Sequence, residues 1–217
     1  SVGSRITLSP DLSNRLRSLF SHLEYCKQKK EELFVNWTPD EDCPGHFLEL
    51  FEPPEGVFFN NTTSSPTYGI CRHNFDANKM FLYKDLKVKK EIMQKVKEVQ
   101  DKLSLDYNAV HIRRTDHVLI RKQRNIYQPD ELFFNFIDNN KDRPLYIATD
   151  NLETQKIFYD KFAPLIKYIK FIQKSGFRHT SLEDSVIDLY LCIGAKRFKG
   201  TGWSSFSGLI RQVRNNN

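Results

Sequence analysis

The chain has 217 residues, enough for one ordinary domain or two small ones. Hydrophobic residues make up 39% and charged residues 28% of it, which excludes the composition of a disordered chain. Thirty-three Lys and Arg against 27 Asp and Glu give a net charge of +6, so acidic or polyphosphate partners are favoured over basic ones. No apolar run approaches the roughly 20 residues of a membrane span, and we expect no membrane segment in this chain.

Strand and helix alternate along the sequence, the pattern of an α/β fold with mainly parallel sheets. In the first half, strands are expected at residues 4–8, 33–37 and 56–59, helices at residues 12–29 and 87–103, and a loop at residues 60–68. In the second half, strands are expected at residues 109–112, 145–148, 168–172 and 197–199, and helices at residues 130–136, 152–162, 181–193 and 204–213. The long middle helix suggests a boundary, and we predict two small Rossmann-like lobes, residues 1–104 and 105–217, with a cleft between them.

Four polar clusters directly follow predicted strands, where open α/β sheets bind their ligands. They are Asn14-Arg15, residues 111–116, residues 149–151 and residues 201–205. In residues 111–116 a strand runs straight into His-Ile-Arg-Arg-Thr-Asp, and the arginine fork matches phosphate oxygens. Adjacent arginines point in different directions, so one can reach a ligand while the other pairs with a carboxylate. The alternative is a salt-bridged strand end without a ligand.

A second anion site is predicted where the last helix begins. Gly200 and Gly202 allow close approach of the backbone, and Ser204 and Ser205 precede the amino-terminal turn of the helix. A simple helix cap would use the same serines. Asp188, in an apolar run of the preceding helix, is either an exposed residue or an acceptor directed at a base edge.

Together these clusters resemble the motifs of core-type and nodulation fucosyltransferases, a branch related to the protein O-fucosyltransferases. Residues 111–116 resemble the H-x-R-R-T-D signature, residues 146–150 the second motif, and Asp188 with residues 200–205 the third. Residues 12–15, 33–37 and 43–51 also resemble the opening segments of relatives.

The resemblance implies a GT-B-like enzyme that transfers L-fucose from GDP-fucose to a glycan acceptor with inversion, without a metal or other cofactor. Arg113 would contact the β-phosphate and Arg114 would support it. His111 and Asp188 would lie against the guanine. Asp116 and Asp150 match functional acidic positions. Thr201, Ser204 and Ser205 are implied to hold the diphosphate. Asn14 and Arg15 are implied to contribute to donor binding from the first lobe.

Two departures from the family pattern affect these implications. Residues 11–15 read Asp-Leu-Ser-Asn-Arg in place of a glycine-rich G-x-G-N-R turn, which requires a different backbone path. The family's Lys and Glu base after the first motif are replaced by His117 and Arg121. An imidazole can take a proton near neutral pH, so His117 is the candidate base and Asp116 a weaker one. A base in the first lobe or on the acceptor stays open.

Three other functions are compatible with parts of the sequence. Asp40-Glu41-Asp42 is a D-x-D pattern, which would hold a metal in a GT-A glycosyltransferase. The pI near 9.0 is typical of nucleic-acid-binding modules, but the basic residues are spread along the chain and we expect no nucleic-acid partner. Replacement of the family base also leaves open a non-catalytic nucleotide-sugar-binding protein.

The cysteines and targeting signals leave the compartment undecided. Cys26, Cys43, Cys71 and Cys192 have no zinc-type spacing, and free thiols are expected over a Cys43–Cys71 disulfide. N-glycosylation triplets begin at Asn36, Asn60 and Asn61. We expect a soluble, cytoplasmic protein, or a secretory-pathway protein if an anchor has been removed, and a chain that belongs to a larger multidomain polypeptide is compatible with its abrupt start.

Overall fold

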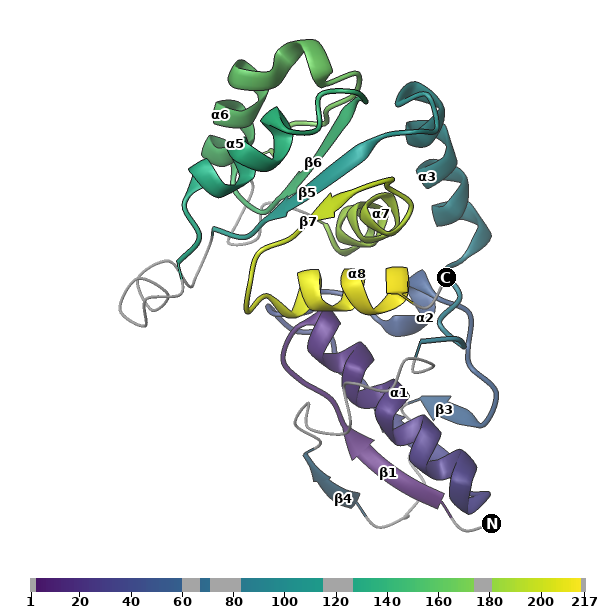
Figure 1. The fold of residues 1–217 in the computed structure, drawn as a ribbon. Helices are drawn as coiled ribbons and strands as arrows, with labels where there is room; N and C mark the ends of the chain where they lie inside the picture. The colour runs from purple at the N-terminus through teal and green to yellow at the C-terminus, as the bar shows by residue number, and fades with distance from the viewer. Residues whose placement is uncertain (1–2, 60–66, 71–82, 115–126, 174–180, 216–217) are drawn as a thin grey trace. The chain divides into compact units, whose positions relative to one another are not determined.

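The computed structural model describes residues 3–59, 67–70, 83–114, 127–173 and 181–215. The chain forms two compact units, Ser1–Lys90 with Asn215–Asn217, and Glu91–Arg214 (Figure 1). The division falls earlier than the expected boundary at residue 104, because the middle helix α3 (Lys90–Lys102) groups with the second unit. Both units are built on parallel sheets, so the predicted α/β class is confirmed.

The first unit is a parallel sheet in the order β3-β2-β1-β4 with the long helix α1 (Leu12–Lys29). The strands are β1 (Gly3–Thr7), β2 (Glu32–Asn36), β3 (Val57–Phe59) and β4 (Thr67–Ile70). A short helix, α2 (Phe47–Leu50), follows β2 in the chain. The apolar stripe of α1 is buried with residues of the strands, as its spacing predicts, and this core includes Leu16, Leu19, Leu23, Ile6, Leu33 and Val35.

The second unit is a smaller parallel sheet in the order β6-β5-β7, so that β5 is its central strand. Its strands are β5 (Asn108–Ile112), β6 (Leu145–Thr149) and β7 (Phe198–Lys199). Its further helices are α5 (Asp130–Asp138), α6 (Leu152–Phe162), the 3₁₀ helix η1 (Ala163–Leu165), α7 (Leu182–Ile193) and α8 (Ser205–Asn215).

The two faces of this second sheet have different roles. One face packs Val110, Ile112 and Ile147 against phenylalanines of α5 and α6, forming a dry core. His111 pairs in register with Ala148, and Ala109 with Tyr146, so these four side chains lie on the opposite face. This second face meets α7 and α8, and Figure 1 shows the sheet with α5 and α6 on one side and α7 on the other.

The strand expected at residues 168–172 is wrong, because this segment is irregular. Its backbone is bound by the side chain of Gln155 on α6. The amide nitrogen donates to Lys170 O at 2.8 Å, and the amide oxygen accepts from Ile172 N at 2.9 Å. One glutamine thereby satisfies the backbone groups that a neighbouring strand would otherwise have paired.

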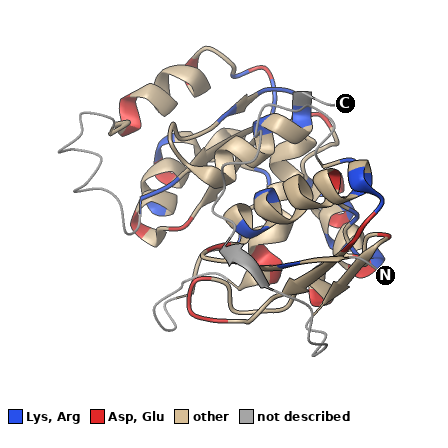
Figure 2. Cartoon of the chain, turned by 90° about the horizontal axis from the view of Figure 1, so that it is seen from below, with Lys and Arg blue, Asp and Glu red and all other residues tan. Residues whose placement is uncertain are grey.

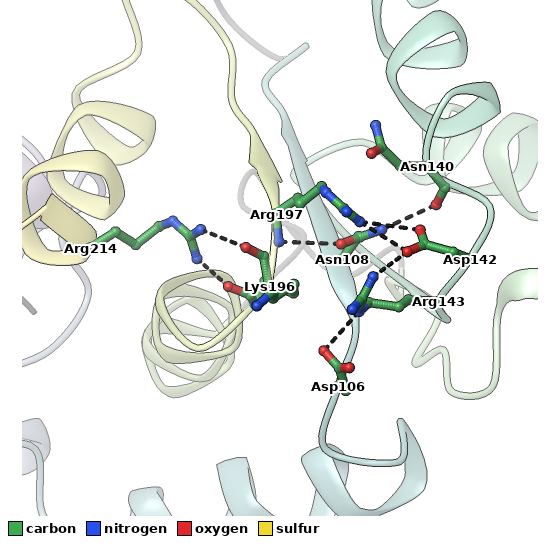
Figure 3. A network of polar contacts seen from close by, with 9 residues as sticks. Asp106, Asn108, Asn140, Asp142, Arg143, Lys196, Arg197 and Arg214 are labelled. Carbon is green, nitrogen blue, oxygen red and sulfur yellow. Dashed lines mark hydrogen bonds and ion pairs between the residues drawn. The ribbon is translucent and has the colours of Figure 1, made fainter.

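A polar network fixes the amino ends of the strands of the second sheet (Figure 3). Asn108, at the start of β5, accepts from Arg197 N at 3.2 Å and donates to Asn140 O at 3.1 Å. The Arg197 guanidinium binds Asp142, which also pairs with Arg143. The network joins the segments before β5, β6 and β7, and it lies at the opposite end of the strands from the predicted ligand site.

Two of the sequence-based expectations concern the cysteines and membrane segments. Cys26 and Cys192 are buried free thiols. Cys43 is also buried, and its expected alternative partner Cys71 lies outside the described residues. In the parts of the chain that the structure describes, every helix is too short or too polar to cross a bilayer.

Candidate functional site

The carboxyl end of β5 carries the predicted site, and His111 anchors it to the last helix. The imidazole is only 7% exposed, and Nδ1 lies 2.5 Å from Ser207 Oγ on α8. The ring also packs against Phe206, with 4.6 Å between the ring centres. These contacts fix the first turn of α8 against the sheet.

Thr201 joins the loop after β7 to the end of β5. Its hydroxyl accepts from Arg113 N at 3.0 Å and donates to His111 O at 2.9 Å. Its own backbone nitrogen donates to Ser207 Oγ at 3.0 Å. The threonine is 1% exposed, so its hydroxyl orders the site and is not presented to a ligand.

The two arginines that follow β5 have different surroundings. Arg114 Nη2 lies 2.6 Å from Asp130 Oδ1, and its guanidinium stacks over Tyr127 at 5.1 Å from the ring centre. Only 9% of that side chain is exposed. Arg113 is 21% exposed, and its Nε lies 4.0 Å from Asp150 Oδ2. Arg114 is therefore the arginine that braces a carboxylate, and Arg113 is the more accessible cation.

Asp150 and its neighbours tie the end of β6 to the end of β5. The Asp150 carboxylate accepts from Arg114 N at 2.9 Å, while Thr149 Oγ1 donates to Ile112 O at 2.6 Å. Asn151 caps α6 by accepting from Thr154 N at 2.8 Å. Asp150 thus holds the backbone from which Arg113 projects.

The amino-terminal turn of α8 completes the cluster. Ser204 Oγ accepts from Ser207 N at 3.3 Å, and Ser205 is the first residue of the helix. Gly202 N donates to Gln128 Oε1 at 2.8 Å, which orders the approach to the helix. Backbone N–H groups at such a terminus, together with the helix dipole, favour an anion.

Arg211 on α8 is a site candidate that the sequence reasoning missed. Its Nη1 would lie 2.8 Å from a Cβ added to Gly200, and Ser207 Oγ would lie 2.7 Å from it, so only glycine fits at position 200. The residue as a whole is exposed, burial lowers the pKa of its guanidinium, and that group has no hydrogen bond or ion pair with any described residue. Its position seven residues after Ser204, on the same helix face, is the signal that could have revealed it.

Asp188 lies on α7 over the same sheet face as His111. Tyr146 of β6 donates its hydroxyl to Asp188 Oδ1. Burial raises the pKa of the Asp188 carboxyl to about 7, while the hydrogen bond from Tyr146 lowers it. Burial also raises the pKa of the Tyr146 hydroxyl well above its ordinary value. At neutral pH the tyrosine therefore keeps its proton and the aspartate is divided between its two protonation states.

The predicted donor-binding residues of the first unit bind within that unit. Asn14 donates to Asp11 and accepts from Arg17 Nη2 at 2.6 Å. Arg15 is 1% exposed and donates to Pro10 O, to Thr38 O and to the carboxylate of Asp40 at 2.9 Å. Arg15 thus ties together the loops that follow β1 and β2, and its donor-binding role stays a prediction.

The same contacts bear on the D-x-D pattern. Asp40 Oδ2 pairs with Arg15, and Asp40 Oδ1 accepts from Asp42 N and Cys43 N, both at 2.9 Å. Asp40 therefore closes a turn and neutralises a buried arginine. Among the described residues, no group of three or more His, Cys, Asp and Glu side chains is arranged to hold a metal ion.

Three predicted residues cannot be placed. Asp116, His117 and Arg121 lie outside the described residues, so the candidate bases have no observed surroundings. Of the remaining predicted donor-site residues, hydrogen bonds and ion pairs link His111, Arg113, Arg114, Asp150, Thr201 and Ser204 into one cluster.

The sequence matches no protein-family model and no curated protein. The fold, however, resembles solved fucosyltransferase structures. NodZ fucosyltransferase from Bradyrhizobium has a TM-score of 0.71 at 13% identity, over 97% of this chain and 93% of that one. NodZ α-1,6-fucosyltransferase soaked with GDP-fucose gives 0.67 at 14% identity, over 98% and 93%. POFUT1 in complex with GDP-fucose gives 0.67 at 12% identity, over 98% and 95%. The predicted GT-B-like fold class is thereby confirmed, with two parallel-sheet units in one chain.

Proposed function

We propose that the chain is a glycosyltransferase that transfers L-fucose from GDP-fucose to a hydroxyl of a glycan acceptor, with inversion and without an essential metal. One observation carries this proposal. Five of the residues that resemble the fucosyltransferase motifs, His111, Arg113, Arg114, Asp150 and Thr201, converge at the carboxyl end of β5. The fold around them is similar to a solved fucosyltransferase soaked with GDP-fucose and to POFUT1 in complex with GDP-fucose.

The proposed reaction places negative charge on the leaving diphosphate as the bond to the sugar breaks. Arg113 and the N–H groups at the start of α8 are fixed donors suited to that charge. Because they are held in place by Thr201, Asp150 and Ser204 before any ligand binds, little reorganisation is required when the charge develops. Arg114, paired with Asp130, keeps this framework rigid.

The base of the nucleotide is assigned to the face of the sheet below α7. His111 and Asp188 both lie over this face, and an ionised carboxylate accepts from the N1–H and 2-amino groups of guanine. This pairing would favour GDP over UDP, whose base lacks that arrangement of donors.

The acceptor hydroxyl must lose a proton when it attacks the sugar. His117 and Asp116 are the proposed bases, since both follow the first motif in the sequence. His117→Ala should lower turnover while GDP-fucose affinity stays near that of the unaltered protein. Unchanged turnover would remove His117 as the base.

GDP release from GDP-fucose, measured with and without a panel of glycan acceptors, tests the proposed activity. We expect acceptor-dependent release that persists in a strong chelator, and a product with inverted anomeric configuration by NMR. Loss of release in chelator would favour the metal-dependent alternative, which the contacts of Asp40 do not support. Tight GDP-fucose binding without release would identify a non-catalytic nucleotide-sugar-binding protein.

A nucleic-acid-binding role has less support. Along the part of the chain that the structure describes, basic and acidic positions are interspersed on the ribbon of Figure 2. Oligonucleotide binding with a steep salt dependence would contradict this assignment.

A further inference from the structure

Tyr146 and Asp188 form a hydrogen-bonded pair between the second sheet and α7. Tyr146 is 7% exposed and is the second residue of β6, whereas Asp188 comes from α7. Their contact joins the sheet to the helix that covers it. Tyr146 Oη is the hydrogen-bond partner of Asp188 among the described residues, and it binds only Oδ1.

We propose that Tyr146 is a positioning residue for nucleotide recognition: its hydroxyl fixes the Asp188 carboxylate so that Oδ2 accepts from the N1–H and 2-amino edge of guanine. This inference rests on the proposed function and specifies how its nucleotide site selects a base. A carboxylate on a helix can rotate about its side-chain bonds, and one strong hydrogen bond from a buried hydroxyl restricts that rotation.

The hydroxyl has a second effect, on the charge of Asp188. Burial favours the neutral acid, and the hydrogen bond from Tyr146 favours the ionised form, which is the form that accepts from guanine. Asp184 on α7 raises the pKa of Asp188, and Lys170 from the segment after η1 lowers it. These two groups are paired with each other at 3.1 Å, so their effects largely offset. Tyr168 and Cys192 complete the titratable surroundings of the pair.

The sign of the pH dependence follows from these contacts. The pKa of Asp188 is raised to about 7, so the ionised carboxylate is fully present at higher pH and is lost as the pH falls through that value. Removing the Tyr146 hydroxyl removes a contact that lowers this pKa, so the midpoint moves to higher pH. The preference for GDP over UDP should then be weakest in acid and should recover in base.

Isothermal titration calorimetry with GDP, IDP and UDP tests the inference. The affinities are measured between pH 5.5 and 9 in steps of about one pH unit, because a single group titrates within this range. GDP and UDP carry the same diphosphate, so their affinity ratio isolates the base. We expect the unaltered protein to prefer GDP, with IDP in between because it lacks the 2-amino group. Tyr146→Phe should reduce the GDP/UDP ratio at pH 7 by about tenfold and should regain only part of it at pH 9, because higher pH restores the charge of Asp188 but not the lost positioning contact.

Two further variants separate this role from a structural one. Tyr190→Phe is the matched control, because Tyr190 is on α7 and its hydroxyl has no hydrogen-bond partner among the described residues. It should leave the ratio and its pH midpoint unchanged. Asp188→Asn should remove the preference at every pH.

The possible failures are distinguishable. If Asp188→Asn loses the GDP preference while Tyr146→Phe keeps both the preference and its midpoint, the positioning role is overturned and the proposed function stands. If the unaltered protein binds GDP and UDP equally, the guanine assignment fails together with the inference.

Discussion

At the scale of single residues, Arg113 and Arg114 show how neighbours in sequence divide two tasks. Arg113→Ala should reduce GDP-fucose affinity by at least about 100-fold, because a charge-assisted contact to the diphosphate is lost. Arg114→Ala should instead lower the free energy of unfolding by about 2 kcal/mol, because Asp130 loses its partner at 2.6 Å. Calorimetric titration and urea denaturation of both variants measure the two effects. If Arg113→Ala lowered stability and Arg114→Ala lowered affinity instead, the roles inferred from the contacts of these two side chains would be wrong.

Arg211 provides a second test at this scale. Arg211→Ala should weaken GDP binding by roughly fivefold, with a smaller salt dependence, because an unpaired cation beside Gly200 is removed. Lys196→Ala is the control of equal charge, since Lys196 is also exposed but lies in the network at the amino end of the strands. Equal weakening by both variants would indicate a general charge effect and no local contact.

At the scale of elements, the end of α7 depends on one side chain. Arg214 on α8 donates through Nη1 to Cys192 O and Ile193 O, both at 3.1 Å, and through Nη2 to Lys196 O at 3.4 Å. The cation also lies at the negative end of the helix dipole. Arg214→Ala should therefore lower the free energy of unfolding by about 2 kcal/mol. Arg214→Lys should restore only part of it, because a point charge cannot span several carbonyls. Urea denaturation checks both values, and full restoration by lysine would show that charge alone matters.

Elements were predictable from sequence where a local pattern specified them. The buried stripe of α1, and the capping of α7 by Ser181, whose hydroxyl accepts from Asp184 N at 3.0 Å, follow from helical spacing and helix-cap chemistry. The irregular conformation of residues 168–172 could not be predicted from a local pattern, because the backbone of this segment is bound by Gln155 on another element. The strand β4 was also missed, because polar and turn-forming residues precede it and its pairing with β1 is distant in sequence.

In the candidate site, too, local sequence patterns predicted some features and tertiary contacts determined the others. Residue types at strand ends predicted the clusters at residues 111–116 and 201–205. They could not show that the Thr201 hydroxyl is used twice within the protein, that Arg114 is bound by Asp130, or that Tyr146 binds Asp188. Such pairings depend on the register of β5 and β6 and on the helices that cover them, which a single sequence does not specify.

At the scale of the whole molecule, the net charge of +6 is not concentrated in the proposed site. Arg114 is neutralised by Asp130, Arg15 by Asp40 and Arg197 by Asp142. Arg113, which lies 4.0 Å from Asp150, and Arg211, which is exposed, are the cations proposed to meet the diphosphate. The electrostatic attraction for a diphosphate is therefore local, and replacing surface lysines elsewhere should affect GDP affinity little at physiological salt.

The last prediction concerns the predicted donor-binding residues, most of which belong to one of the two units. His111, Arg113, Asp150, Asp188 and the start of α8 all belong to the unit Glu91–Arg214, whereas Asn14 and Arg15 belong to the other. Hydrogen exchange with saturating GDP should therefore protect the ends of β5 and β6 and the first turns of α8, because ligand binding suppresses local opening there. UDP is the matched ligand, and protection near α7 should appear with GDP alone.

Added protection at residues 11–15 would show that the first unit also contacts the donor, as the resemblance implies. If GDP protected only those residues, the assignment of the nucleotide to the second sheet would be wrong.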